Sequence, residues 1–214
     1  MKPLRKQGII LFTILALIMV ACGGDTAEET VEEAAPEVVE TLDSPAVTTA
    51  STVKTGVGVT SDPCPEVIGG IPTGADPSKG CIYLGLLNDY TGPFGPYGIP
   101  LETGQRGFWL WANQSGGIGD YSVAIVEGYD TQYNPQKHLE GYKAQRDEVA
   151  ALAMSLGTPQ TQFILDDMDA DNMVAAPMSW YSGWSYKGSD RGLVIEFGAA
   201  YCADGMNAVD WAMA

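Results

Sequence analysis

From Cys81 onward the sequence alternates short apolar runs with longer amphipathic stretches, and this alternation constrains the fold more than any other feature. The apolar runs predict strands because each is short, continuous and bounded by turn-forming residues, and the stretches between them predict helices. Strands that alternate with helices of this length are joined by right-handed crossovers in a parallel sheet. The sequence therefore predicts an α/β domain, a parallel sheet with helices on both faces. Its strands are expected at residues 82–87, 122–126, 149–154, 174–176 and 193–197, and its helices at 100–114, 135–147 and 159–168, with a further helix from residue 203.

The N-terminal residues 1–21 have the pattern of a bacterial lipoprotein signal peptide. A basic start precedes an uninterrupted apolar core over residues 9–20, which is too short for a comfortable membrane span. Residues 19–22, Met-Val-Ala-Cys, resemble a lipobox, in which the cysteine is lipidated and becomes the mature N-terminus. We therefore expect Cys22 to carry lipid and the chain to be anchored outside the cytoplasmic membrane. An uncleaved membrane anchor is the alternative, and it places the rest of the chain on the same side.

Residues 22–62 predict a flexible acidic tether. Between Asp25 and Asp62 there are nine acidic residues, one lysine and no aromatic residue, so the segment cannot bury enough apolar surface to offset its ordering entropy. The whole chain has a net charge of −16 and no basic patch. This charge excludes a nucleic-acid partner and leaves the lipid as the expected link to the membrane.

Four cysteines are present, and their pairing follows from the expected compartment. With Cys22 lipidated, Cys64, Cys81 and Cys202 remain in an oxidising environment. Cys64 and Cys81 flank a Pro/Gly-rich lead-in at residues 63–80, and a disulfide between them would stabilise the fold by about 3 kcal/mol on a chain-entropy estimate. Cys202 is then either a free thiol or paired beyond the end of the chain.

Metal and cofactor sites are not expected. The sequence has no C-x-x-C motif and a single histidine, which makes a zinc site improbable. A D-x-D-x-D run begins at Asp167 as in a calcium loop, but Met178 stands where a bidentate Glu is needed. We interpret the acidic run as a solvated helix end.

Three loops that follow strands are expected to meet at one edge of the sheet, because the carboxyl ends of parallel strands lie at the same edge. Ligands of open α/β sheets bind at this edge. The three loops are residues 88–98, 155–161 and 179–184, which combine aromatic rings, hydroxyl groups and exposed backbone amides. The second loop, Ser-Leu-Gly-Thr-Pro-Gln-Thr, precedes a predicted helix, whose free N–H groups favour an anion. The edge therefore predicts a site for a small zwitterion or amide.

An ordered set of motifs resembles the leucine/isoleucine/valine-type periplasmic binding proteins, the substrate-binding lipoproteins or periplasmic receptors of ABC importers for amino acids and amides. The motifs are Ile82–Leu87, Thr91–Pro93, Pro96–Gly98, Gly116–Ile118, Tyr129–Asp130, Ser155–Thr161 and Ser179–Trp180. The resemblance implies a two-lobed α/β fold that closes on its ligand, with an ABC permease as partner. It also implies ligand-binding residues: the carboxylate of the ligand is received by Ser155, Gly157, Thr158 and Ser179, and the ligand is flanked by Tyr97 and Trp180. Loop packing is the alternative role for the two aromatic residues, and helix capping is the alternative for Ser155 and Thr158.

Family members are longer over the binding region. We therefore expect residues 81–198 to form the first ligand-binding lobe and residues 199–214 to begin the crossover to a second lobe, so that the chain reads as a truncated copy or fragment.

Two other functions match parts of the sequence. Residues 153–157 are one substitution from the G-x-S-x-G nucleophile elbow, which would make Ser155 the nucleophile of a serine hydrolase. Such a triad needs a histidine downstream of the serine, whereas the single histidine, His138, lies upstream on a polar helix and is interpreted as a surface residue. A surface scaffold or adhesin-type lipoprotein without a small ligand is the second alternative. The favoured hypothesis is a non-enzymatic solute-binding lipoprotein for an amino acid, amide or short peptide.

Overall fold

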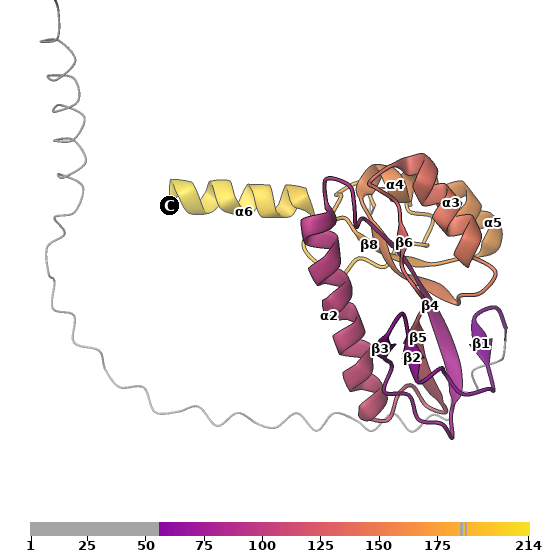
Figure 1. Cartoon of the computed structure of the whole chain (residues 1–214). Coiled ribbons are helices and arrows are strands. Elements are labelled where there is room, and N and C mark those ends of the chain that lie inside the picture. Colours follow the sequence, from indigo (N-terminus) through magenta and orange to yellow (C-terminus); the bar gives the residue numbers. More distant parts are fainter. Residues whose placement is uncertain (1–55, 185, 187) are drawn as a thin grey trace, which may run out of the picture. The chain divides into compact units, whose positions relative to one another are not determined.

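Strand β4 (Gly80–Asn88) lies in the middle of a six-stranded, mostly parallel sheet (Figure 1). The computed structural model describes residues 56–184, 186 and 188–214. The expected signal peptide, the lipidation site Cys22 and most of the expected tether lie outside the described residues. β4 pairs in parallel with β5 (Tyr121–Ile125), β6 (Tyr129–Asp130) and β7 (Ala151–Leu156), and β7 pairs in parallel with β8 (Ala175–Met178). The predicted α/β class and parallel sheet are thus confirmed.

Helices cover both faces of this sheet. Alternate residues of β4 point to opposite faces, so each face has its own core cluster. Leu86 packs with Ile125 and Met154 in a core cluster that includes Leu101 and Trp109 of α2 (Gly95–Gln114). On the other face, Leu87 packs against α3 (Pro135–Gln145), α4 (Thr158–Phe163) and α5 (Leu165–Asp171). Tyr142 of α3, Met168 of α5 and Ile164, which lies between α4 and α5, join the cluster of Leu87.

The end of the expected tether belongs to the fold. β1 (Val59–Thr60) pairs antiparallel with residues Ile82 and Cys81 of β4, so order begins before residue 63. The predicted disulfide between Cys64 and Cys81 is confirmed, with a Cα–Cα distance of 4.7 Å. It closes the lead-in, which contains a small hairpin of β2 (Val67–Ile68) and β3 (Ile71–Pro72). Cys202 is a free, exposed cysteine.

Several predicted boundaries differ from the observed ones. α2 begins at Gly95, five residues before the predicted start, and contains Pro100. On this helix Leu101 contacts the core, whereas Phe108 and Trp111 are 53% and 61% exposed. The predicted helix 159–168 is two short helices that meet at Ile164, and the predicted strand 193–197 is reduced to a single bridge between Val194 and Ala175. The predicted C-terminal helix is α6 (Tyr201–Met213), which buries none of its residues.

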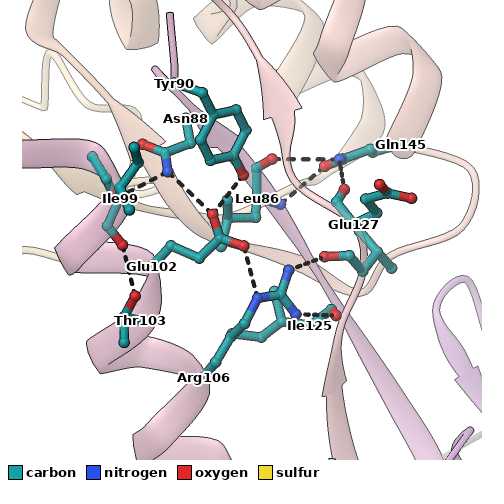
Figure 2. A network of polar contacts seen from close by, with 12 residues as sticks. Leu86, Asn88, Tyr90, Ile99, Glu102, Thr103, Arg106, Ile125, Glu127 and Gln145 are labelled. Atoms are coloured by element: carbon teal, nitrogen blue, oxygen red, sulfur yellow. Dashed lines mark hydrogen bonds and ion pairs between the residues drawn. The ribbon is translucent and has the colours of Figure 1, made fainter. Parts of the chain in front are cut away.

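A largely buried ion pair links α2 to the strands beside it (Figure 2). Arg106 Nε lies 2.7 Å from Glu102 Oε1, and its other guanidinium nitrogens donate to the carbonyl oxygens of Ile125 and Val126 at 3.0 and 2.9 Å. Glu102 Oε2 accepts from the phenol of Tyr90 at 2.6 Å and from the amide of Asn88 at 3.3 Å. Since every polar group in this cluster has a partner, the pair fixes α2 against the ends of β4 and β5.

Within the described residues, no helix has both the length and the apolar character needed to cross a membrane.

Candidate functional site

A cavity of about 590 Å³ lies at the carboxyl ends of the strands, where the sequence analysis placed a ligand site. It is lined by residues of the loop after β4 and the start of α2, of the loop before α3, of the junction between β7 and α4, of β8 and the segment after it, and of α6. Its lining residues are Phe94, Tyr97, Pro100, Leu101, Tyr133, Leu156, Gly157, Thr158, Met178, Trp180 and Tyr201. The surface that they present is mainly apolar and aromatic, and its volume is within the range of small-molecule sites.

Gly157 lines the cavity and precedes α4. Its φ of 105° lies in a region that side chains rarely adopt, and an added Cβ would stand 2.2 Å from Gln160 Oε1 and 2.7 Å from Tyr133 Cε2. Only glycine fits there. Gly157 therefore leaves its backbone open to the cavity and makes room for the ring of Tyr133.

Phe94 is positioned by a buried carboxylate. Asp89, at the end of β4, is fully buried, and its two oxygens accept hydrogen bonds from the backbone N–H groups of Gly92 and Phe94 at 2.6 and 2.7 Å. These bonds close the turn that starts α2. The ring of Phe94 then lies 4.1 Å, centroid to centroid, from that of Tyr133.

Trp180 follows β8 and is supported by two aromatic neighbours. Its ring meets those of Phe197 and Tyr201 edge-on, with centroid distances of 5.6 and 6.2 Å. The N–H of Tyr201 also donates to the carbonyl oxygen of Trp180 at 2.8 Å. The start of α6 therefore holds the indole at the wall of the cavity.

The structure brings four of the six predicted ligand-binding residues to this cavity: Tyr97, Gly157, Thr158 and Trp180. Ser155 and Ser179 lie behind it instead. Ser179 is 4% exposed, and its hydroxyl bonds to that of Thr158 and accepts from Trp184 Nε1. Both serines thus hold the walls rather than present a free hydroxyl.

Ser155 is fully buried because β7 extends to Leu156, two residues beyond the predicted strand end. Ser155 pairs in register with Leu87, so its side chain shares the face covered by α3 and α4. Its Oγ lies 2.8 Å from His138 Nε2 and 2.7 Å from Thr161 Oγ1. The interpretation of His138 as a surface residue is wrong: the side chain is fully buried, since His138, Tyr142 and Gln145 form the inner side of α3.

One proton arrangement satisfies the contacts of this His138–Ser155–Thr161 cluster. Thr161 donates to the carbonyl oxygen of Gly157 at 2.9 Å, Ser155 donates to Thr161, and His138 Nε2–H donates to Ser155. His138 Nδ1 is then an acceptor, with no partner among the described residues. Burial lowers the pKa of His138 from 6.5 to about 3, so the ring stays neutral at physiological pH.

Sequence reasoning did not predict the other lining residues, which are Phe94, Pro100, Leu101, Tyr133, Leu156, Met178 and Tyr201. Phe94 lies within the loop that was singled out, so its aromatic ring was a usable signal. Tyr133 stands directly before Asn134, whose side chain caps α3, and only the folded turn brings its ring to the cavity. Among the described residues, no group of three or more His, Cys, Asp or Glu side chains could hold a metal ion.

Comparison with known proteins defines the class. A profile of the periplasmic binding protein family matches residues 81–214, which is more than half of the chain. The chain therefore belongs to the periplasmic binding protein family, whose members are extracytoplasmic and include the substrate-binding proteins of ABC transporters. The predicted resemblance to periplasmic binding proteins is therefore confirmed at the level of the family. No curated protein sequence matches the chain.

Solved structures share the fold over part of their length. The chain resembles a fatty acid ABC transporter substrate-binding protein from Thermomonospora curvata at 26% identity and a TM-score of 0.60, covering 75% of this chain and 36% of that one. A branched chain amino acid ABC transporter from Thermus thermophilus with bound valine gives 15% identity, a TM-score of 0.55 and coverages of 63% and 35%. A possible leucine/isoleucine/valine-binding protein from Rhodopirellula baltica gives 18% identity, a TM-score of 0.55, and coverages of 62% of this chain and 35% of that one. The chain thus spans little more than a third of the length of these structures.

Proposed function

We propose that this protein is an extracytoplasmic solute-binding lipoprotein, without enzymatic activity, that captures an amino acid, an amide or a short peptide for an ABC permease. Cys22 carries the lipid that anchors it, and residues 81–198 act as the first ligand-binding lobe. The observation that carries the proposal is the cavity at the carboxyl edge of the sheet, lined by the loops after β4, β7 and β8 in a chain of this family.

In this proposal the ligand lies between Tyr97 and Trp180, and its polar end meets the backbone of Gly157 and Thr158. Tyr97 is 66% exposed and can move toward a ligand, whereas Trp180 is fixed by Phe197 and Tyr201. Ser155 and Ser179 act indirectly, because their hydroxyl groups hold the Gly157 carbonyl, through Thr161, and the Thr158 hydroxyl. The full burial of Ser155 argues against a hydrolytic role, because a nucleophile must reach its substrate.

Calorimetry of the full chain against a panel of amino acids, amides and short peptides tests the proposal. We expect at least one member of the panel to bind, and Trp180→Ala to weaken that binding about tenfold, because the indole supplies one side of the cavity. Trp111→Ala is the matched control, since Trp111 is 61% exposed on α2 and does not line the cavity. A folded protein that binds nothing in the panel would favour the scaffold function instead.

The anchor is tested separately. Mass spectrometry of the membrane fraction should find the N-terminal peptide beginning at a lipid-modified Cys22, and Cys22→Ser should abolish this species. An unmodified, uncleaved N-terminus in the membrane fraction would contradict the lipoprotein assignment.

A further inference from the structure

We propose that Tyr133 and Phe94 form an aromatic wall that selects ligands carrying a planar aromatic group. The inference rests on the proposed function, since it concerns the same cavity, and it narrows the chemical class of the ligand. From the sequence, Tyr133 was not expected at the site, and Phe94 was expected only as part of the loop at residues 88–98.

The two rings come from separate segments and meet at the cavity. Phe94 stands at the start of α2 and Tyr133 in the loop before α3, and their centroids are 4.1 Å apart with an interplanar angle of 31°. Phe94 remains 38% exposed and Tyr133 is half-buried. The pair therefore presents aromatic surface to the cavity instead of filling the core.

The backbone at Tyr133 is strained, which points to a use for its ring. Gln132 and Tyr133 have φ values of 49° and 53°, a region that suits glycine and asparagine and disfavours an aromatic residue. The surrounding contacts maintain this conformation: Gln160 Nε2 donates to the carbonyl oxygen of Tyr133 at 2.6 Å, and Asp130 Oδ1 accepts from the Gln132 N–H at 3.2 Å. Strain that the surrounding structure over-determines is concentrated at ligand sites.

A third segment is shaped to receive the same ring. Gly157 has no Cβ, and an added one would stand 2.7 Å from Tyr133 Cε2. The turn at Gln132, the Asp89-bound start of α2 and the glycine before α4 thus converge on one pair of rings. This convergence is more than the packing of an isolated surface tyrosine requires.

The chemistry of the lining selects the ligand. Five of the eleven lining residues are aromatic, and none of these eleven is Lys, Arg, Asp, Glu or His. The part of the ligand that lies against these side chains is therefore uncharged, while its polar end meets the backbone of Gly157 and Thr158. An aliphatic group gains only from burial, whereas an aromatic ring also gains from offset or edge-on contacts with the wall. Burial raises the pKa of Tyr133, with further contributions from nearby Tyr201 and Asp89, so its phenol stays protonated and can donate to a polar substituent.

Two pairs of probes isolate aromaticity from size and polarity. They are benzamide against cyclohexanecarboxamide, and phenylalanine against cyclohexylalanine, which keep the polar group and differ in the ring. Binding to the full chain is measured by calorimetry or by saturation-transfer NMR. We expect the aromatic member of at least one pair to bind about tenfold more tightly.

Variants then assign this preference to the wall. Tyr133→Asn removes the ring and places at φ 53° a residue that tolerates this backbone, so the melting temperature should hold or rise while the aromatic preference disappears. Phe94→Leu removes the other ring without touching the strained turn, and it keeps the test decisive if Tyr133→Asn does not fold. Phe163→Leu, on the 50% exposed Phe163 of α4, is the control and should keep the preference.

The outcomes separate the two proposals. Equal binding of aromatic and aliphatic probes, or a preference that survives both wall variants, overturns the aromatic wall and leaves the solute-binding function standing. A folded chain that binds neither these probes nor the wider panel overturns both.

Discussion

Two buried polar clusters, one on each face of the sheet, hold the edges of the cavity by different means. The His138–Ser155–Thr161 cluster is neutral and passes hydrogen bonds along a chain of side chains to the Gly157 carbonyl. The cluster around the Glu102–Arg106 pair is charged and binds backbone carbonyl oxygens at the end of β5 (Figure 2). Neither includes a ligand-facing group in our proposal. The comparison teaches that buried residues outside the cavity hold its lining segments in place. The loss of these residues should alter stability in different ways.

The largest expected effect is the loss of Arg106. In Arg106→Met, Glu102 keeps a buried charge without its partner, and the carbonyl oxygens of Ile125 and Val126 lose their donors, so we expect a loss of about 3–5 kcal/mol in the free energy of unfolding. Urea denaturation measures it. Arg191→Met removes an exposed pair with Asp166 and Asp169, which water and salt screen, and should change the free energy of unfolding far less. Equal losses in the two variants would show that the buried pair has no special role.

Acid should destabilise the protein through the neutral cluster. The folded-state pKa of His138 is lowered to about 3, so between pH 6.5 and pH 3 the unfolded chain binds a proton that the folded chain does not. The free energy of unfolding should therefore fall by up to about 1.4 kcal/mol per pH unit as the pH drops through this window, and this contribution should be constant above it. Denaturation at several pH values should show a shallower fall in His138→Gln. An identical slope in both proteins would contradict the assignment.

Ser155→Ala should have an intermediate effect. The change leaves His138 Nε2–H and the Thr161 hydroxyl without their shared partner, and a loss of about 1–3 kcal/mol is expected at neutral pH. Ser115→Ala, at the exposed end of α2, is the control and should stay within about 0.5 kcal/mol. Thermal unfolding distinguishes the two. A loss of ligand binding in Ser155→Ala at unchanged stability would instead indicate direct contact with the ligand.

The smallest effect is expected at Tyr90 in the charged cluster. Burial, followed by the hydrogen bond and the charge of Glu102, raises the pKa of Tyr90 above its usual 10. The unfolded chain then loses its proton first, so stability should fall as the pH rises beyond 10. Tyr90→Phe should cost about 1 kcal/mol at neutral pH and reduce this alkaline loss, leaving the parts that Tyr142 and Tyr133 contribute. If stability falls equally above pH 10 in Tyr90→Phe and in the original protein, Tyr90 does not cause the alkaline loss.

The fold was predictable where short-range pattern decides it. The apolar runs that became β4, β5 and β7 and the alternation around them identify the α/β class, and the Cys64–Cys81 pair followed from counting cysteines. The split between α4 and α5 at Ile164 and the loss of a strand at 193–197 depend on tertiary packing, which local propensity does not report.

The candidate site was predictable as an edge of the sheet but not residue by residue. The predicted strand ended two residues too early, so Ser155 was expected in a loop. It lies in β7 instead, where its register with Leu87 buries it. His138 was misplaced because a polar helix gave no apolar period by which to find its inner face. Tyr133 depends on a left-handed turn between two elements, and no sequence rule indicates that conformation for Gln-Tyr.

The central claim is that a small ligand binds in the cavity lined by Gly157 and Trp180. Amide NMR of the full chain, titrated with any panel member that binds, tests it most directly. We predict the largest shift changes at Phe94, Gly157, Thr158 and the indole of Trp180. Shift changes confined to the second cavity beside α2, about 430 Å³ in volume and lined by Ile71, Thr103 and Gly107 among others, would contradict the claim.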